Sequence, residues 1–76
     1  MRVGTDCRFL IDGTAIVRSV QLDNKWVPVS QGRQWVSETG RHVMIQLPWD
    51  EVRELVLSSE TMVWEIRPNT APQPEA

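Results

Sequence analysis

Apolar and polar residues alternate along most of this chain, with the two-residue period of a β-strand that buries one face. Pairs of turn-forming residues interrupt the alternation at short intervals. These pairs are Asp12-Gly13, Asp23-Asn24, Gln31-Gly32, Thr39-Gly40 and Ser58-Ser59. Short alternating stretches between frequent turns are typical of an all-β meander, in which each strand pairs with the next one along the chain.

The turn positions also predict which residues face one another. Across a two-residue hairpin loop, paired residues keep a constant sum of residue numbers. This rule pairs Phe9 with Ile16, Val20 with Val27, Gln21 with Trp26, Val27 with Val36, Trp35 with Met44, and Val36 with Val43. The first four turns therefore agree on one division of the side chains between two faces.

One of these faces is predicted to form the core, with Arg18 and Gln34 as its polar exceptions. Its apolar members are Phe9, Ile11, Ile16, Val20, Leu22, Val27, Val29, Val36, Val43, Ile45 and Leu47. The opposite face mixes polar residues with large apolar ones. There the register places Trp26 diagonal to Trp35, close enough for large side chains to touch. A cluster of Trp, Pro, Trp and Met side chains is therefore predicted outside the core.

The segment 49–57 fits two structures. Val52, Leu55 and Val56 recur at helical spacing behind Asp50, a residue type that caps helices. The same stretch also suits a strand, and periodicity alone does not decide between a short helix and a short strand. We favour the strand.

The last alternating run, around Trp64, completes the predicted fold. A hairpin at Ser58-Ser59 would pair Leu55 with Met62 and place Trp64 in the core. We therefore expect an all-β fold, a small antiparallel meander that forms an SH3-like or OB-like barrel or half-barrel. At most one short helical turn is expected, near 49–57.

The length and composition fit a single small domain. The chain has 76 residues, and we place a single β domain at residues 1–67. Residues 68–76 contain three prolines and no aliphatic side chain larger than alanine, so we predict a disordered Pro-rich tail. Eight basic and ten acidic residues give a net charge of −2 at pH 7. This balance favours neither a nucleic acid nor an acidic membrane as partner.

No motif for catalysis, a metal or a cofactor is found. Cys7 is the only cysteine and His42 the only histidine, which are too few ligands for a zinc site within one chain. The predicted register places His42 opposite Ser37 as a cross-strand polar residue, and a nucleophile beside a base cannot be recognised from one sequence. The glycines are isolated, so there is no glycine-rich phosphate loop. We expect no enzymatic activity, no metal and no cofactor.

The cysteine content and the N-terminus bear on the compartment. A single cysteine cannot form an internal disulfide. The first residues have no apolar stretch like that of a signal peptide, and no apolar run is long enough to span a membrane. We therefore expect a cytoplasmic protein without a membrane partner.

The tryptophans give the main hint of function, because the chain has four of them with one phenylalanine and no tyrosine. We predict a binding surface formed by Trp26, Pro28, Arg33, Trp35 and Met44, since Trp and Arg are enriched at binding hot spots. The predicted function is a non-enzymatic protein-interaction module or a self-associating accessory protein, such as a homodimer.

Two alternatives remain open for the tryptophans. Trp26 and Trp35 could instead cover a second small core. They could also stack the bases of a single-stranded nucleic acid while arginines contact its phosphates. The acidic net charge disfavours this last function.

Overall fold

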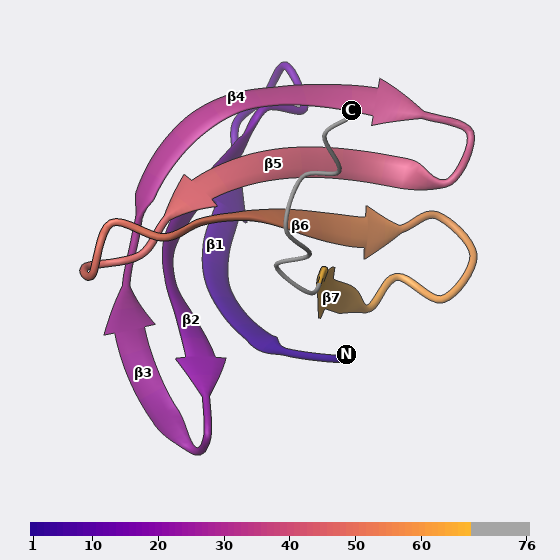
Figure 1. The fold of residues 1–76 in the computed structure, drawn as a ribbon. Helices are drawn as coiled ribbons and strands as arrows, with labels where there is room; N and C mark the ends of the chain where they lie inside the picture. The colour runs from indigo at the N-terminus through magenta and orange to yellow at the C-terminus, as the bar shows by residue number, and fades with distance from the viewer. Residues whose placement is uncertain (68–76) are drawn as a thin grey trace, which may run out of the picture.

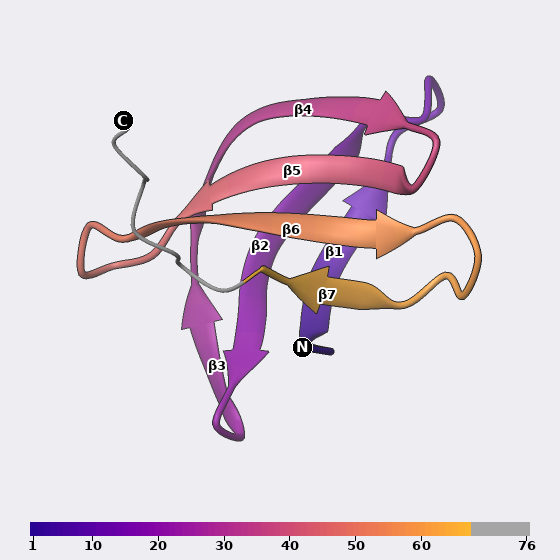
Figure 2. The ribbon, with the colours of Figure 1, turned by 45° about the vertical axis from the view of Figure 1, so that its right-hand side comes forward.

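The computed structural model describes residues 1–67, and within this range it contains seven strands in two antiparallel sheets and no helix (Figure 1). The first sheet contains β1 (Gly4–Phe9), β2 (Ala15–Leu22) and β3 (Lys25–Pro28), in that order. The second contains β4 (Ser30–Ser37), β5 (Gly40–Gln46), β6 (Val52–Ser58) and β7 (Trp64–Ile66), also in chain order. The strands of one sheet run across those of the other (Figure 2).

The predicted all-β class is confirmed, and so is the strand alternative for the segment that includes Val52. The helical turn near 49–57 is not formed. A tight turn precedes β6 instead, in which the Asp50 N–H donates to the Leu47 carbonyl at 2.9 Å. Within residues 1–67 the two sheets do not join into a closed barrel, so the SH3-like or OB-like barrel stays a prediction. The predicted tail, 68–76, lies outside the described residues.

The core lies between the sheets. Its buried members are Val3, Ala15, Val17, Val20, Val43, Ile45, Leu47, Leu55, Trp64 and Ile66. The core positions predicted for Val20, Val43, Ile45, Leu47 and Trp64 are therefore confirmed. The prediction is wrong for Phe9, Ile11 and Val36, which are exposed, and for Ala15 and Val17, which are buried.

A one-residue shift in the first hairpin accounts for most of these errors. Phe9 pairs with Ala15, one position from its predicted partner, because the loop holds residues 10–14 rather than two residues. A shift of one residue moves every side chain to the other face of a strand. A second irregularity, between Asp6 and Cys7, then restores the predicted register over the rest of β1 and β2.

The turn at Asp23-Asn24 is formed as predicted. Both residues have positive φ, 50° and 65°, which is the conformation that a two-residue hairpin loop requires. Val20 pairs with Val27 across this turn. Asp and Asn tolerate this conformation well, so these two residues are sufficient to predict the turn.

The hairpin predicted at Gln31-Gly32 is not formed. β4 continues through these residues, and its register with β5 shifts between Gln31 and Gln34. Gly32 therefore marks a β-bulge, the other common position for a glycine inside a strand. As a result, β3 does not pair with β4, and the chain passes from one sheet to the other around Val29.

The last two predicted turns are displaced. The β4–β5 loop consists of Glu38 and Thr39, so Trp35 pairs with His42 rather than Met44. This shift of two residues leaves each side chain on its predicted face. The β6–β7 loop is longer than a two-residue turn, so Leu55 pairs with Ile66 and Met62 is exposed.

Two glutamine side chains join the sheets along β2 and β4. The Ala15 N–H donates to Gln34 Oε1 at 3.0 Å, and the Val17 N–H donates to Gln31 Oε1 at 2.7 Å. The Nε2 groups of both glutamines donate to the Ala15 carbonyl. These side-chain amides therefore take the place of backbone hydrogen bonds between the sheets. They also explain why Gln34 is a polar member of an otherwise apolar face.

The segment before β1 also meets the last strand, β7. Arg2 forms an antiparallel bridge with Glu65. The Val3 N–H donates to the Trp64 carbonyl at 3.0 Å, and the Ile66 N–H donates to the Met1 carbonyl at 2.9 Å. The two sheets are therefore linked at a second place, between the segment before β1 and β7.

Candidate functional site

The outer face of the second sheet carries a group of polar and aromatic side chains, which we call the histidine cluster: Trp35, Ser37, His42 and Glu54. Trp35 lies on β4, His42 is its partner on β5, and Glu54 lies on β6. These positions alternate with the core residues of the same strands. The cluster therefore points away from the core.

His42 is the centre of this cluster. Its ring stacks on the ring of Trp35 with centroids 5.1 Å apart and an angle of 1° between the planes. Its Nδ1 lies 2.5 Å from Glu54 Oε2, and its Nε2 lies 2.6 Å from Ser37 Oγ. A carboxylate accepts hydrogen bonds only, so Nδ1 carries a proton in this contact, and in the neutral ring Nε2 then accepts from the Ser37 hydroxyl. The His42 side chain is buried, whereas Ser37 is exposed.

The β4–β5 hairpin fixes Ser37 relative to His42. Ser37 pairs with Gly40, so it lies diagonal to His42 on the same face of the sheet. The Thr39 N–H donates to Ser37 Oγ at 3.2 Å, and the Thr39 carbonyl accepts from the Ser59 N–H at 2.9 Å. Hydrogen bonds of Thr39 with Ser37 and with Ser59 therefore fix the turn.

The five predicted binding residues are divided between the two sheets. Arg33, Trp35 and Met44 lie in the second sheet, where the guanidinium carbon of Arg33 is 5.0 Å from the centre of the Trp35 ring. Trp26 and Pro28 lie on β3, in the first sheet. The register that placed Trp26 diagonal to Trp35 is not formed, because there is no hairpin at Gln31-Gly32 and β3 does not pair with β4. A binding role for the five residues stays a prediction.

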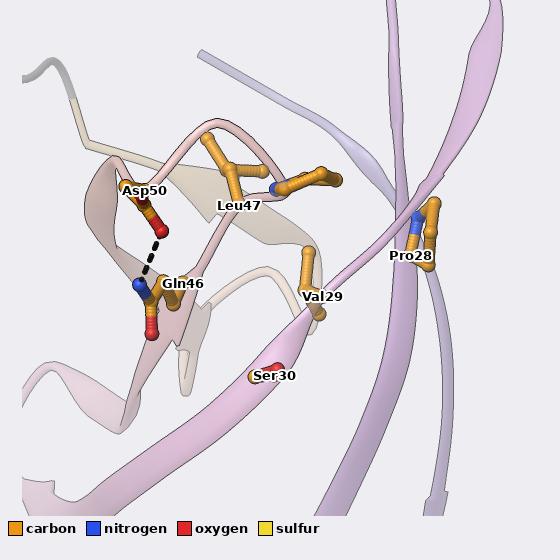
Figure 3. A pocket seen from close by; sticks show the side chains of 7 residues that line it. Pro28, Val29, Ser30, Gln46, Leu47 and Asp50 are labelled. Carbon is orange, nitrogen blue, oxygen red and sulfur yellow. Dashed lines mark hydrogen bonds between the residues drawn. The ribbon is translucent and has the colours of Figure 1, made fainter.

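Each of the two β3 residues borders a hollow. Trp26 is half-exposed beside a hollow that is also lined by Asp6 and Ser19. Pro28 borders another hollow of about 430 Å³, between the start of β4 and the β5–β6 turn (Figure 3). In this second hollow, Gln46 Nε2 donates to Asp50 Oδ1 at 3.1 Å. Two of its polar side chains are thus paired with each other, and Ser30 is a third polar residue in the lining.

A second surface was not found by sequence reasoning. Phe9, Leu10 and Ile11 are all exposed at the tip of the β1–β2 hairpin, and the side chain of Ile11 is fully exposed. The loop that follows lies near Arg41, whose side chain would be 3.8 Å from a Cβ at Gly13. Arg41 pairs with Val36 across β4 and β5, and Val36 is 65% exposed. We call Phe9, Leu10, Ile11 and Val36 the tip patch. Its sequence signal is three consecutive large apolar residues directly before a turn, which breaks the alternation of a half-buried strand.

The chain matches no known family model, curated protein or solved structure. Among residues 1–67, no group of three or more His, Cys, Asp or Glu side chains is arranged to hold a metal ion. The same part of the chain has no helix that is long and apolar enough to cross a membrane.

The Cys7 thiol is expected to react slowly with iodoacetamide at pH 8 in the folded protein. Burial raises the pKa of Cys7 above its ordinary value of 9.0, although a hydrogen bond with Trp64 acts in the opposite direction. The thiolate is the reactive form, so a raised pKa leaves little of it at this pH. Mass spectrometry of time points in buffer and in 8 M urea would measure the difference. Equal rates in both solutions would contradict the prediction.

Proposed function

We propose that the protein is a protein-interaction module that associates with a second copy of itself through the tip patch. The observation that carries the proposal is the exposure of Phe9, Leu10 and Ile11 at one hairpin tip. A contiguous exposed apolar patch on a small domain is characteristic of a binding surface. The tip patch differs from the five-residue surface predicted from the sequence, which stays a prediction.

The charges around the tip patch suit a second copy. Asp12 lies in the same loop, and its hydrogen bond from the Thr14 N–H lowers its pKa, so the carboxylate stays ionised at neutral pH. Arg41 is close to this loop, and Arg8 is exposed on β1. The rim of the tip patch therefore carries both negative and positive charges. Across a two-fold axis, Asp12 of one copy can approach an arginine of the other.

The expected affinity is modest. Burying a Val, Leu, Ile or Phe side chain contributes about 1.5–3 kcal/mol when the whole side chain leaves water. Ile11 is fully exposed, whereas Phe9, Leu10 and Val36 are already partly buried, so burying the patch on two copies gains on the order of 10 kcal/mol. Association costs roughly 4–15 kcal/mol in lost freedom of motion. The net gain is at most about 6 kcal/mol, so a weak dimer with a dissociation constant of about 40 μM to 1 mM is the expected result.

Ile11→Ser is expected to weaken this dimer by at least about tenfold, because Ile11 is the most exposed member of the tip patch. Analytical ultracentrifugation over a wide concentration range would give the dissociation constants. Val52→Ser is the matched control, because Val52 is half-exposed on β6 and lies outside the tip patch. A wild-type chain that stays monomeric at millimolar concentration would refute the proposal, and so would equal association of the wild type and Ile11→Ser.

Binding of a single-stranded nucleic acid has less support. Trp26 and Trp35 would have to stack neighbouring bases, but they lie in different sheets. Arg33, one of the arginines that would contact phosphate, lies over the Trp35 ring. The net charge of −2 also opposes a polyanion.

A further inference from the structure

The histidine cluster lies outside the tip patch, and self-association gives it no role. Its Ser, His and Glu side chains follow the order nucleophile, base, carboxylate that serine hydrolases use on several unrelated folds. We propose that Ser37 is a nucleophile, activated by His42 and Glu54, that accepts acyl groups from small activated esters. This inference is independent of the association proposed above, and it opposes the expectation of a non-enzymatic chain.

The distances within the cluster fit this role. A base must lie about 2.6–3.2 Å from the nucleophile, and a third group must orient the base. Ser37 Oγ is 2.6 Å from His42 Nε2, and Glu54 Oε2 is 2.5 Å from His42 Nδ1. The stacked ring of Trp35 holds the imidazole in its plane. His42 is therefore fixed by its contacts, with one nitrogen toward the carboxylate and the other toward the Ser37 hydroxyl, with the Thr39 hydroxyl further away at 3.3 Å.

The exposure of the two side chains also fits. His42 is 7% exposed, so it is shielded from water, whereas the Ser37 side chain is exposed at the last position of β4. A substrate can therefore reach the hydroxyl from solvent without displacing the base. Because Ser37 lies beside a two-residue turn, the site suits a small ester with a good leaving group rather than a polymer.

The acylation step uses only groups that are present. As Ser37 Oγ bonds to the carbonyl carbon, its proton passes to His42 Nε2, and Glu54 stabilises the resulting imidazolium. The negative charge moves to the carbonyl oxygen, and a backbone donor beside it is the Thr39 N–H, which donates to Ser37 Oγ at 3.2 Å in the free protein. When the intermediate collapses, the ester C–O bond breaks and the leaving oxygen takes the proton from Nε2. The products are acyl-Ser37 and an alcohol.

Hydrolysis of acyl-Ser37 uses the same groups in the reverse order, with water in place of the alcohol. A solvent water gives a proton to His42 Nε2 and its oxygen bonds to the acyl carbon. The bond to Ser37 Oγ then breaks, and the serine recovers its proton from the imidazolium. The sum is ester plus water to acid plus alcohol, with no oxidant or reductant.

The test is covalent labelling of the full chain with a fluorophosphonate, a reagent that phosphonylates activated serines. We expect one adduct by intact mass, mapped to Ser37 by peptide sequencing. Ser37→Ala should lose the adduct. Ser30→Ala should keep it, because Ser30 is another exposed serine on β4 and its partner on β5 is Gln46 rather than a histidine.

Glu54→Gln tests whether the carboxylate acts through His42. The amide cannot support the imidazolium, so the rate of labelling at Ser37 should fall by roughly a hundredfold, the lower end of what a positioned base contributes. Circular dichroism would establish that this variant is folded. An unlabelled wild-type chain, a label on another residue, or equal labelling rates for folded Glu54→Gln and wild type would each overturn the proposal. Release of p-nitrophenol from p-nitrophenyl acetate by the wild type, but not by Ser37→Ala, would extend it to turnover.

Discussion

Replacing Gly40 with alanine is expected to abolish cooperative folding. Gly40 has a φ of 146° and pairs with Ser58 across β5 and β6. An alanine Cβ there would lie 1.9 Å from the Leu57 carbonyl oxygen and 3.0 Å from the Ser59 nitrogen. Both are backbone atoms, so the clash can be relieved only by separating the strands. We expect a loss of at least about 4 kcal/mol, which is comparable with the whole stability of a small domain.

The stability of Gly40→Ala would be measured by urea unfolding, followed by tryptophan emission and circular dichroism. Gly32→Ala is the matched control. A Cβ at Gly32 would meet Met44 at 3.6 Å, an ordinary contact distance, so this variant should stay within about 1 kcal/mol of the wild type. A cooperative transition for Gly40→Ala at the wild-type urea concentration would show that the turn adapts, and that the glycine is not required.

Trp64→Ala is expected to lower the free energy of unfolding by about 3–5 kcal/mol, the usual range for deleting a buried aromatic side chain. Trp64 is 9% exposed and belongs to the core between the two sheets. Its removal leaves a cavity beside Cys7 and the inward side chains of both sheets. Urea unfolding by circular dichroism gives the value, since the emission of the protein changes with the loss of a tryptophan.

Trp26→Ala provides the control for this measurement, because the ring of Trp26 is 54% exposed. Its loss should cost about 1 kcal/mol or less. Equal losses for the two variants would mean that Trp64 does not carry the core, which would contradict its burial.

Much of the fold is predictable because the strand period and one turn are encoded locally. Asp23 and Asn24 accept the left-handed conformation of their turn, and the paired valines follow from it. At Gly32 the same kind of local signal has two meanings, a turn or a bulge, and only the packing of the sheets decides between them. The loop at residues 10–14 shows the same limit, because one turn signal does not specify the length of the loop.

The candidate site was predictable only in part, because it combines neighbours in one hairpin with a residue from a third strand. Ser37 and His42 belong to one hairpin, so the sequence predicted them on the same face. Glu54 joins them because β6 pairs with β5, in the region where the sequence left helix and strand open. Glu54 could be identified as the partner of His42 only once the pairing of β5 with β6 was known.

The bridge between Arg2 and Glu65 has a consequence for the synthesis of this protein. Most contacts in each sheet join strands that are adjacent along the chain, so hairpins can form while the ribosome is still translating. The segment before β1 cannot form its hydrogen bonds until β7 has been synthesised, because its partners are in β7. The core cannot close until Trp64 and Ile66 have left the exit tunnel. A nascent chain of this protein therefore completes this fold only after β7 has emerged from the ribosome.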